Sequence, residues 1–290
     1  MRSNLIRAGL HALLVMAALL SGRAGTASAQ ESLDVQDVRV EYNFGRQINF
    51  LARLPLPSGI TQASVLFRRS DEEITHVGAL ALEPDGTARF TYDASLNLIP
   101  PFSNIVFWFQ AAFSDHSSRT SPVFYFRYDD NRFAWQKASD GFLSVHWYDG
   151  GDAFGQQALD SARQGASAIG ALLGLALDAP VEIYVYASGE DLQGALRPGG
   201  KEWIGGHADP ALGAAMVSVP PGEAQAIQMQ AEIPHELAHV LLYRSIGQGY
   251  ERLPAWLSEG IASFVEAYPK PDYASALASA ARSGALIRFS

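Results

Sequence analysis

The 290-residue sequence contains no cysteine, and it has fewer basic than acidic residues, 21 against 30. The absence of cysteine excludes disulfide bonds, thiolate metal sites and cysteine nucleophiles. The formal net charge of −9 disfavours binding to nucleic acid and to anionic membranes, because both carry negative charge. After residue 29, no hydrophobic run approaches the roughly 20 residues of a membrane-spanning helix. We therefore expect no nucleic-acid partner and no stable membrane insertion of the mature chain.

Residues 1–29 have the pattern of a secretory signal peptide. Arg2 and Arg7 precede an apolar segment from Ala8 to Leu20, and an Ala-Ser-Ala sequence at 27–29 is a typical cleavage site. An uncleaved membrane anchor is the less favoured alternative, because the apolar segment of about 13 residues is shorter than a bilayer requires. We expect a secreted, extracellular protein that begins at Gln30. Removal of this segment makes the chain more acidic, because its charged residues are all arginines.

Residues 30–132 consist of short alternating apolar and polar segments separated by Pro, Gly, Asp and Ser. This pattern predicts an all-β sandwich of immunoglobulin or fibronectin type III kind. The expected strands are 35–44, 48–56, 63–69, 75–82, 87–92, 105–113 and 122–128. Its many aromatic residues are best explained as core side chains, and the alternative is an exposed face that binds carbohydrate. We expect this domain to be a spacer or docking module without catalytic residues.

Residues 133–290 mix strand and helix patterns and predict an α+β domain. Strands are expected at 142–148 and 181–186, and helices at 153–175, 191–197 and 273–282. Ala214–Val219 is expected to be an edge strand, because two prolines follow it, and the alternative is an ordinary interior strand. A further helix should begin between residues 222 and 233, and Pro234 either starts a new helical segment or bends that helix.

The segment His235-Glu236-Leu237-Ala238-His239 has the spacing of a zinc-binding helix. Residues four positions apart lie on one face of a helix, about 6 Å apart along its axis, so both imidazoles can bind one Zn²⁺ ion. Glu236 lies about 100° further round, where it can reach a water bound to the metal. We predict His235 and His239 as zinc ligands and Glu236 as the catalytic general base. The alternative is a buried helix whose two histidines are merely hydrogen-bonded.

A catalytic zinc needs a third protein ligand, and without cysteine this must be His, Asp or Glu. Glu259 is the best candidate, because Pro254 suits the first turn of a second helix that carries it. A connection of about ten residues allows two antiparallel helices, so Glu259 can return over the histidine pair. The predicted metal ligands are therefore His235, His239 and Glu259.

The pattern His235-Glu236-x-x-His239 followed by Glu259 is similar to that of the gluzincin metallopeptidases, thermolysin and its relatives. The sequences at 233–240 and 254–262 look most like the peptidase MA-like family of bacterial secreted proteins, and the likeness covers roughly 133–290. The resemblance implies a zincin-like fold, the same three zinc ligands, and Glu236 as the catalytic carboxylate. It also implies that Ala214–Val219 aligns an extended peptide by strand addition.

The resemblance makes Tyr250 a candidate for a phenol that stabilises the transition-state oxyanion. His207, near the expected strand 214–219, is a candidate for substrate binding, and the alternative is a solvated loop histidine. Ser263 stands where thermolysin relatives commonly have an acid that supports a ligand, so the outer hydrogen bonds of the histidines are unassigned. Gluzincins normally add a helical subdomain, so we expect this domain to be truncated at its C-terminus and to be less active for that reason.

These features predict a secreted zinc-dependent peptidase that hydrolyses peptide or protein substrates. One alternative is a non-catalytic secreted β-sandwich binding protein with a vestigial zinc site. The other is a zinc hydrolase that acts on a different amide, such as cell-wall peptide.

Overall fold

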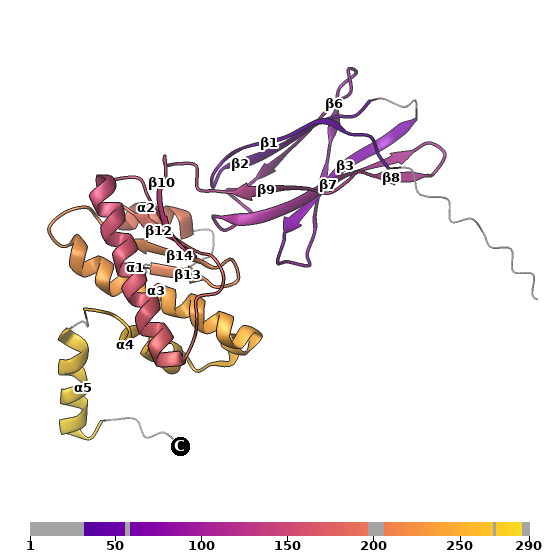
Figure 1. Ribbon diagram of the computed structural model, residues 1–290. Coiled ribbons are helices and arrows are strands. Elements are labelled where there is room, and N and C mark those ends of the chain that lie inside the picture. Colours follow the sequence, from indigo (N-terminus) through magenta and orange to yellow (C-terminus); the bar gives the residue numbers. More distant parts are fainter. Residues whose placement is uncertain (1–31, 56–58, 197–205, 269–270, 286–290) are drawn as a thin grey trace, which may run out of the picture. The chain divides into compact units, whose positions relative to one another are not determined.

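The computed structural model describes residues 32–55, 59–196, 206–268 and 271–285. The predicted signal peptide at 1–29 lies outside the described residues. None of the helices in the described ranges is both long enough and apolar enough to cross a bilayer. The described chain begins with β-sheets and continues into an α+β region (Figure 1). This confirms the predicted order of the two regions, while the boundary between residues 132 and 133 stays a prediction.

The first region contains two antiparallel sheets. One sheet has the order β1-β2-β6-β5, with β1 at Gln36–Asn43, β2 at Gln47–Arg53, β6 at Thr87–Asp93 and β5 at Ala81–Leu82. The other has the order β4-β3-β7-β8, with β4 at His76–Ala79, β3 at Ile60–Arg69, β7 at Ser103–Phe113 and β8 at Ser118–Thr120. Strand β9 (Phe124–Tyr128) also pairs with β7.

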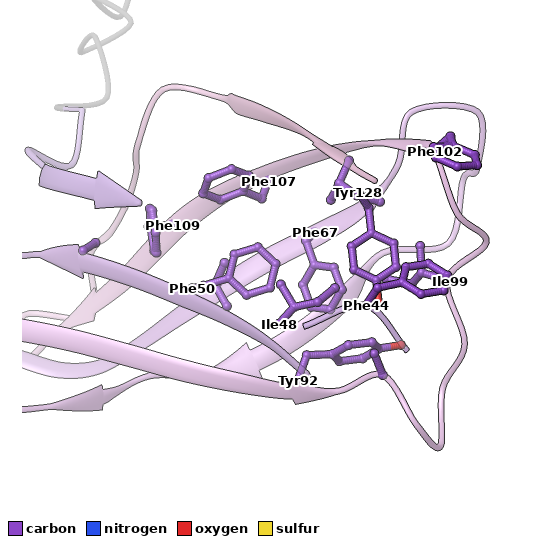
Figure 2. Close-up of a cluster of buried hydrophobic side chains, with 14 of the residues drawn as sticks. Phe44, Ile48, Phe50, Phe67, Tyr92, Ile99, Phe102, Phe107, Phe109 and Tyr128 are labelled. Carbon is purple, nitrogen blue, oxygen red and sulfur yellow. The ribbon is translucent and has the colours of Figure 1, made fainter. Parts of the chain in front are cut away.

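Aromatic side chains from the two sheets meet in a shared core. The ring of Phe50 on β2 lies 4.8 Å from that of Phe67 on β3 and 5.3 Å from that of Phe107 on β7. Figure 2 shows these rings between the strands, with Phe44 and Tyr128 beside them. These aromatic residues thus serve the core, as the strand pattern indicated, whereas Tyr125 on β9 is exposed. The immunoglobulin or fibronectin type of this sandwich stays a prediction.

The expected strand at 75–82 is divided between the two sheets. Strand β4 pairs with β3 of one sheet, and β5 pairs with β6 of the other, so the chain changes sheets at Leu80. The backbone N–H of Leu80 donates to the carbonyl of Ala63 at this crossing. Strand β8 is absent from the sequence prediction, because its Ser-Arg-Thr sequence has no apolar alternation.

The second region is built on a five-stranded sheet in the order β10-β11-β12-β14-β13. Strands β11, β12 and β14 are parallel, and β10 and β13 pair antiparallel at the two edges. The strands are β10 (Gln136–Asp140), β11 (Leu143–Trp147), β12 (Val181–Tyr186), β13 (Gly206–Asp209) and β14 (Ala214–Ser218). The helices are α1 (Gly151–Leu173), α2 (Gly189–Leu196), α3 (Gln225–Ile246), α4 (Ala255–Phe264) and α5 (Pro271–Ser283), with a 3₁₀ helix η2 at Gly247–Arg252.

The prediction that Ala214–Val219 is an edge strand is wrong. Strand β14 lies between β12 and β13, and residues 214–217 are buried. The parallel strands of a sheet covered on both faces are apolar along their whole length, and the Ala-Ala-Met-Val sequence fits that pattern. The edge position belongs to β13, the short strand that precedes it.

Helix α3 continues through Pro234 rather than beginning there. It packs closely on α1 at Gly165, where an added Cβ would lie 2.9 Å from the Cα of Pro234. Below 3.0 Å such a contact forces a shift, so only glycine allows the two helices this separation. The apolar face of α3 joins Leu237 and Val240 to a core with Ile183 and Val217 of the sheet. This packing fixes the helix that carries the two histidines.

Candidate metal centre

The three predicted metal ligands converge at the facing sides of α3 and α4. His235, His239 and Glu259 each offer one ligand atom, and these atoms lie within 4.8 Å of one another. The Nε2 atom of His235 is 3.3 Å from Oε2 of Glu259, and the Nε2 atom of His239 is 3.6 Å from Oε1. The structure therefore places both imidazoles and the carboxylate around one point, with the same ring nitrogen of each histidine facing the carboxylate.

The surroundings of these three side chains suit a metal ion. The two histidine side chains are 17% and 10% exposed, whereas Glu259 is 59% exposed, so the site is open on the α4 side. Burial lowers the pKa of His239 below its ordinary value of 6.5; the carboxylate of Glu259 opposes this shift, and His235 reinforces it. A lowered pKa keeps the imidazole neutral, and the neutral form is the one that binds metals.

The outer nitrogens of both histidines have hydrogen-bond partners that sequence reasoning did not assign. The Nδ1 atom of His235 lies 2.9 Å from Oε1 of Glu266, and the Nδ1 atom of His239 lies 2.8 Å from the hydroxyl of Tyr250. Glu266 follows the end of α4 and supplies the carboxylate that contacts a histidine from behind. Ser263, at the position expected for such an acid, has no carboxylate. Tyr250 comes from η2 and contacts a ligand from behind. Both outer nitrogens are thus engaged, and both Nε2 atoms are directed to the site.

The buried carboxylate of Glu266 also favours a cation at this site. The carboxylate of Glu266 is buried, and its Oε2 atom has no hydrogen-bond partner among the described residues. A buried carboxylate with so few partners is costly unless positive charge lies nearby. A dication held by His235 would supply that charge through the imidazole. Two imidazole nitrogens and one carboxylate oxygen are also a frequent ligand set of catalytic zinc.

Glu236, the predicted general base, is buried between α3 and β13. A Cβ added at Gly206 would lie 2.4 Å from its Oε1 atom, so the carboxylate lies directly against the strand. Glu236 therefore lies beside the histidine pair without being one of the three converging ligands.

An open cavity of about 380 Å³ lies over these groups. Strand β13 forms one wall through Gly206, His207 and Ala208, and Tyr250 contributes to another. Successive side chains on a strand point to opposite faces. Because Gly206 faces Glu236, the imidazole of His207 belongs to the other face of β13. His207 is nevertheless among the residues that line the cavity, and its role in substrate binding stays a prediction.

Residues 161–290 match a family model described as the peptidase MA superfamily. The match includes α3, α4 and the converging ligands, and it supports a metallopeptidase-like domain in this part of the chain. Peptidases of this superfamily are typically zinc-dependent. No sequence among the curated proteins matches the chain.

Solved structures share only limited similarity with the chain. One described as a myokine structure is 10% identical, with a TM-score of 0.27, and the match covers 34% of this chain and 99% of that chain. The fn3 domain of human contactin 1 is 14% identical, with a TM-score of 0.27 and coverages of 42% and 98%. The purple acid phosphatase PPD1 from yellow lupin (Lupinus luteus) is 7% identical, with a TM-score of 0.29 and coverages of 70% and 40%. TM-scores this low support no conclusion about fold or function.

Proposed function

We propose that the chain is a secreted zinc-dependent peptidase of gluzincin type, whose metal is held by His235, His239 and Glu259. The observation that carries this proposal is the convergence of these three side chains at a cavity that also contains Glu236. The match of residues 161–290 to the peptidase MA superfamily supports the same activity. A merely structural zinc site would have four protein ligands and no free position, whereas the described residues contribute three.

In this proposal, Glu236 is the general base. Zinc, when bound, polarises the peptide carbonyl and lowers the pKa of a water molecule in the site to about 7. Glu236 would remove a proton from that water as the water oxygen forms a bond to the carbonyl carbon, and it would then donate the proton to the amine nitrogen as the C–N bond breaks. Positioned proton transfer of this kind contributes about 10² to 10⁴-fold to the rate. The position of Glu236 against Gly206 holds the carboxylate beside the metal ligands.

Strand β13 is the element best placed to bind the substrate. Among the described residues, β13 pairs only with β14, and its residues Gly206, His207 and Ala208 line the cavity. An extended peptide could add to this edge by main-chain hydrogen bonds, which recognise any sequence. We therefore propose peptide or protein substrates that bind in extended form along Gly206–Asp209.

The decisive experiment measures zinc content and peptide hydrolysis on the same preparation of the mature chain. We expect about one zinc per chain, hydrolysis of a mixed peptide library, loss of activity with a chelator and recovery with zinc. Glu236→Gln should retain zinc and lose at least about 100-fold in kcat. Unchanged hydrolysis by that variant would refute the mechanism, and a zinc-loaded wild-type chain that cleaves no peptide would refute the function. Expression with residues 1–29 tests secretion, because cleavage before Gln30 gives a defined N-terminus.

A further inference from the structure

The two imidazoles of the metal centre are each held from behind, but by different chemical groups. Glu266 contacts Nδ1 of His235 through a carboxylate oxygen, and Tyr250 contacts Nδ1 of His239 through a phenol. The two partners come from different elements, because Tyr250 lies in η2 and Glu266 follows α4. Neither residue offers one of the three converging ligand atoms.

The contact with Glu266 fixes which nitrogen of His235 carries hydrogen. An ionised carboxylate can only accept a hydrogen bond, so Nδ1 is the donor in this contact, and in a neutral imidazole the lone pair is then on Nε2. That lone pair points to Glu259, on the side where the ligand atoms converge. The side chain of Glu266 is 1% exposed, so water does not weaken this hydrogen bond. The contact with Glu266 therefore orients the ring of His235 so that Nε2 faces the other ligand atoms.

The contact with Tyr250 fixes the orientation of His239 but not its tautomer. A phenol has one hydrogen to donate and lone pairs to accept with, so Nδ1 of His239 can play either part. Metal binding at Nε2 selects the tautomer in which Nδ1 donates to the phenol oxygen. The ring of Tyr250 packs edge-on against Tyr243 of α3, with centroids 5.8 Å apart, so its hydroxyl is held in place.

We propose that Tyr250 and Glu266 are positioning residues that orient His239 and His235 for metal binding, and that Tyr250 acts in this way rather than as the donor to the transition-state oxyanion. The inference rests on the proposed zinc site, and it adds the residues that determine its affinity. Hydrogen-bond partners behind metal-bound histidines typically change metal affinity 10 to 100-fold when they are removed. A donor to the oxyanion would instead change kcat and leave zinc affinity unchanged.

The test measures the zinc dissociation constant by competition with a chromophoric chelator. Tyr250→Phe and Glu266→Gln keep the shape of each side chain, and both should raise the zinc dissociation constant by about 10 to 100-fold. Tyr243→Phe removes a hydroxyl from a neighbouring ring, and Glu223→Gln removes a charge from the exposed segment before α3. Both controls should bind zinc like the wild type. The visible spectrum of the cobalt-substituted variants gives a second readout of ligand geometry.

Each outcome decides between the alternatives. Wild-type zinc affinity in Tyr250→Phe, with kcat reduced by about 100-fold, would make Tyr250 the oxyanion donor and overturn the proposal. Wild-type affinity in both variants would overturn it as well, while leaving the proposed function intact. A wild-type chain that binds no zinc would instead remove the proposed function itself. Circular dichroism shows whether Glu266→Gln folds in the absence of metal. If this variant is unfolded, the zinc affinity of Tyr250→Phe decides, because Tyr250 is partly exposed.

Discussion

The carboxylate of Glu236 occupies the space that a side chain at residue 206 would need. A Cβ at Gly206 would lie 2.4 Å from Oε1 and 2.8 Å from the carboxyl carbon, and real Cβ atoms essentially never come closer than 3.0 Å to a neighbour. A glycine on β13 thus lets a buried acid on α3 lie at the floor of the cavity. The position of the candidate general base therefore depends on a glycine in the edge strand.

Gly206→Ala should therefore displace the candidate base without touching the metal ligands. We expect a reduction of kcat by about tenfold or more, because errors of about 1 Å in the position of a reacting group cost up to about 100-fold. Zinc affinity should be unchanged, because Glu236 is not a ligand. Gly189→Ala is the matched control, since the nearest atom to its Cβ would be 3.9 Å away. Wild-type kcat in Gly206→Ala would show that Glu236 does not need this position.

Zinc should stabilise the folded chain through His239 and not through Glu236. A ligand present at 1,000 times its dissociation constant stabilises the native state by about 4 kcal/mol, provided that it does not bind the unfolded chain. We expect this gain in urea unfolding of the wild type, its loss in His239→Ala, and its retention in Glu236→Gln. Equal loss in both variants would mean that Glu236 belongs to the ligand set.

The spacing of the candidate metal ligands is governed by local geometry, so their convergence could be predicted from the sequence, while their role as ligands stays a prediction. His235 and His239 lie one helical turn apart, and this relation depends on the helix alone. Glu259 required only that a second helix return across a short connection. The observed convergence of all three agrees with that reasoning.

The positioning residues could not be found in the same way. Glu266 lies beyond the end of α4 at Phe264, so helical periodicity does not predict its direction. The direction of Tyr250 depends on the packing of η2 against α3. Sheet order is equally non-local, and the four residues of β13 have no strand pattern of their own. The apolar sequence of β14 did contain a signal for an interior strand, which the following prolines outweighed.

The close contact of α1 and α3 provides a test of the scaffold apart from the chemistry. Gly165→Ala would place a Cβ 2.9 Å from the backbone of Pro234, one residue before the first histidine. We expect a loss of about 1 to 3 kcal/mol in the free energy of unfolding, despite the better helix propensity of alanine. Ser167→Ala, on the exposed side of the same helix, should change stability by less than about 0.5 kcal/mol. Equal stability of both variants would show that the helices can separate without cost.

Glu182 on β12 should make folding stability depend on acid pH. Its hydrogen bond with His146 lowers its pKa below the ordinary value of 4.5, although burial opposes the shift, and Lys137 adds to it. The unfolded chain therefore takes up the proton first as the pH falls, so the stabilisation is complete above about pH 4.5 and is lost through the lower folded-state pKa. Glu182→Gln should cost about 1 kcal/mol at pH 7 in urea unfolding, and progressively less as the pH falls below 4.5 through the lower folded-state pKa. Glu83→Gln, at an exposed position, is the control. A cost for Glu182→Gln that stays constant across this range would show that the interaction does not depend on the carboxylate charge.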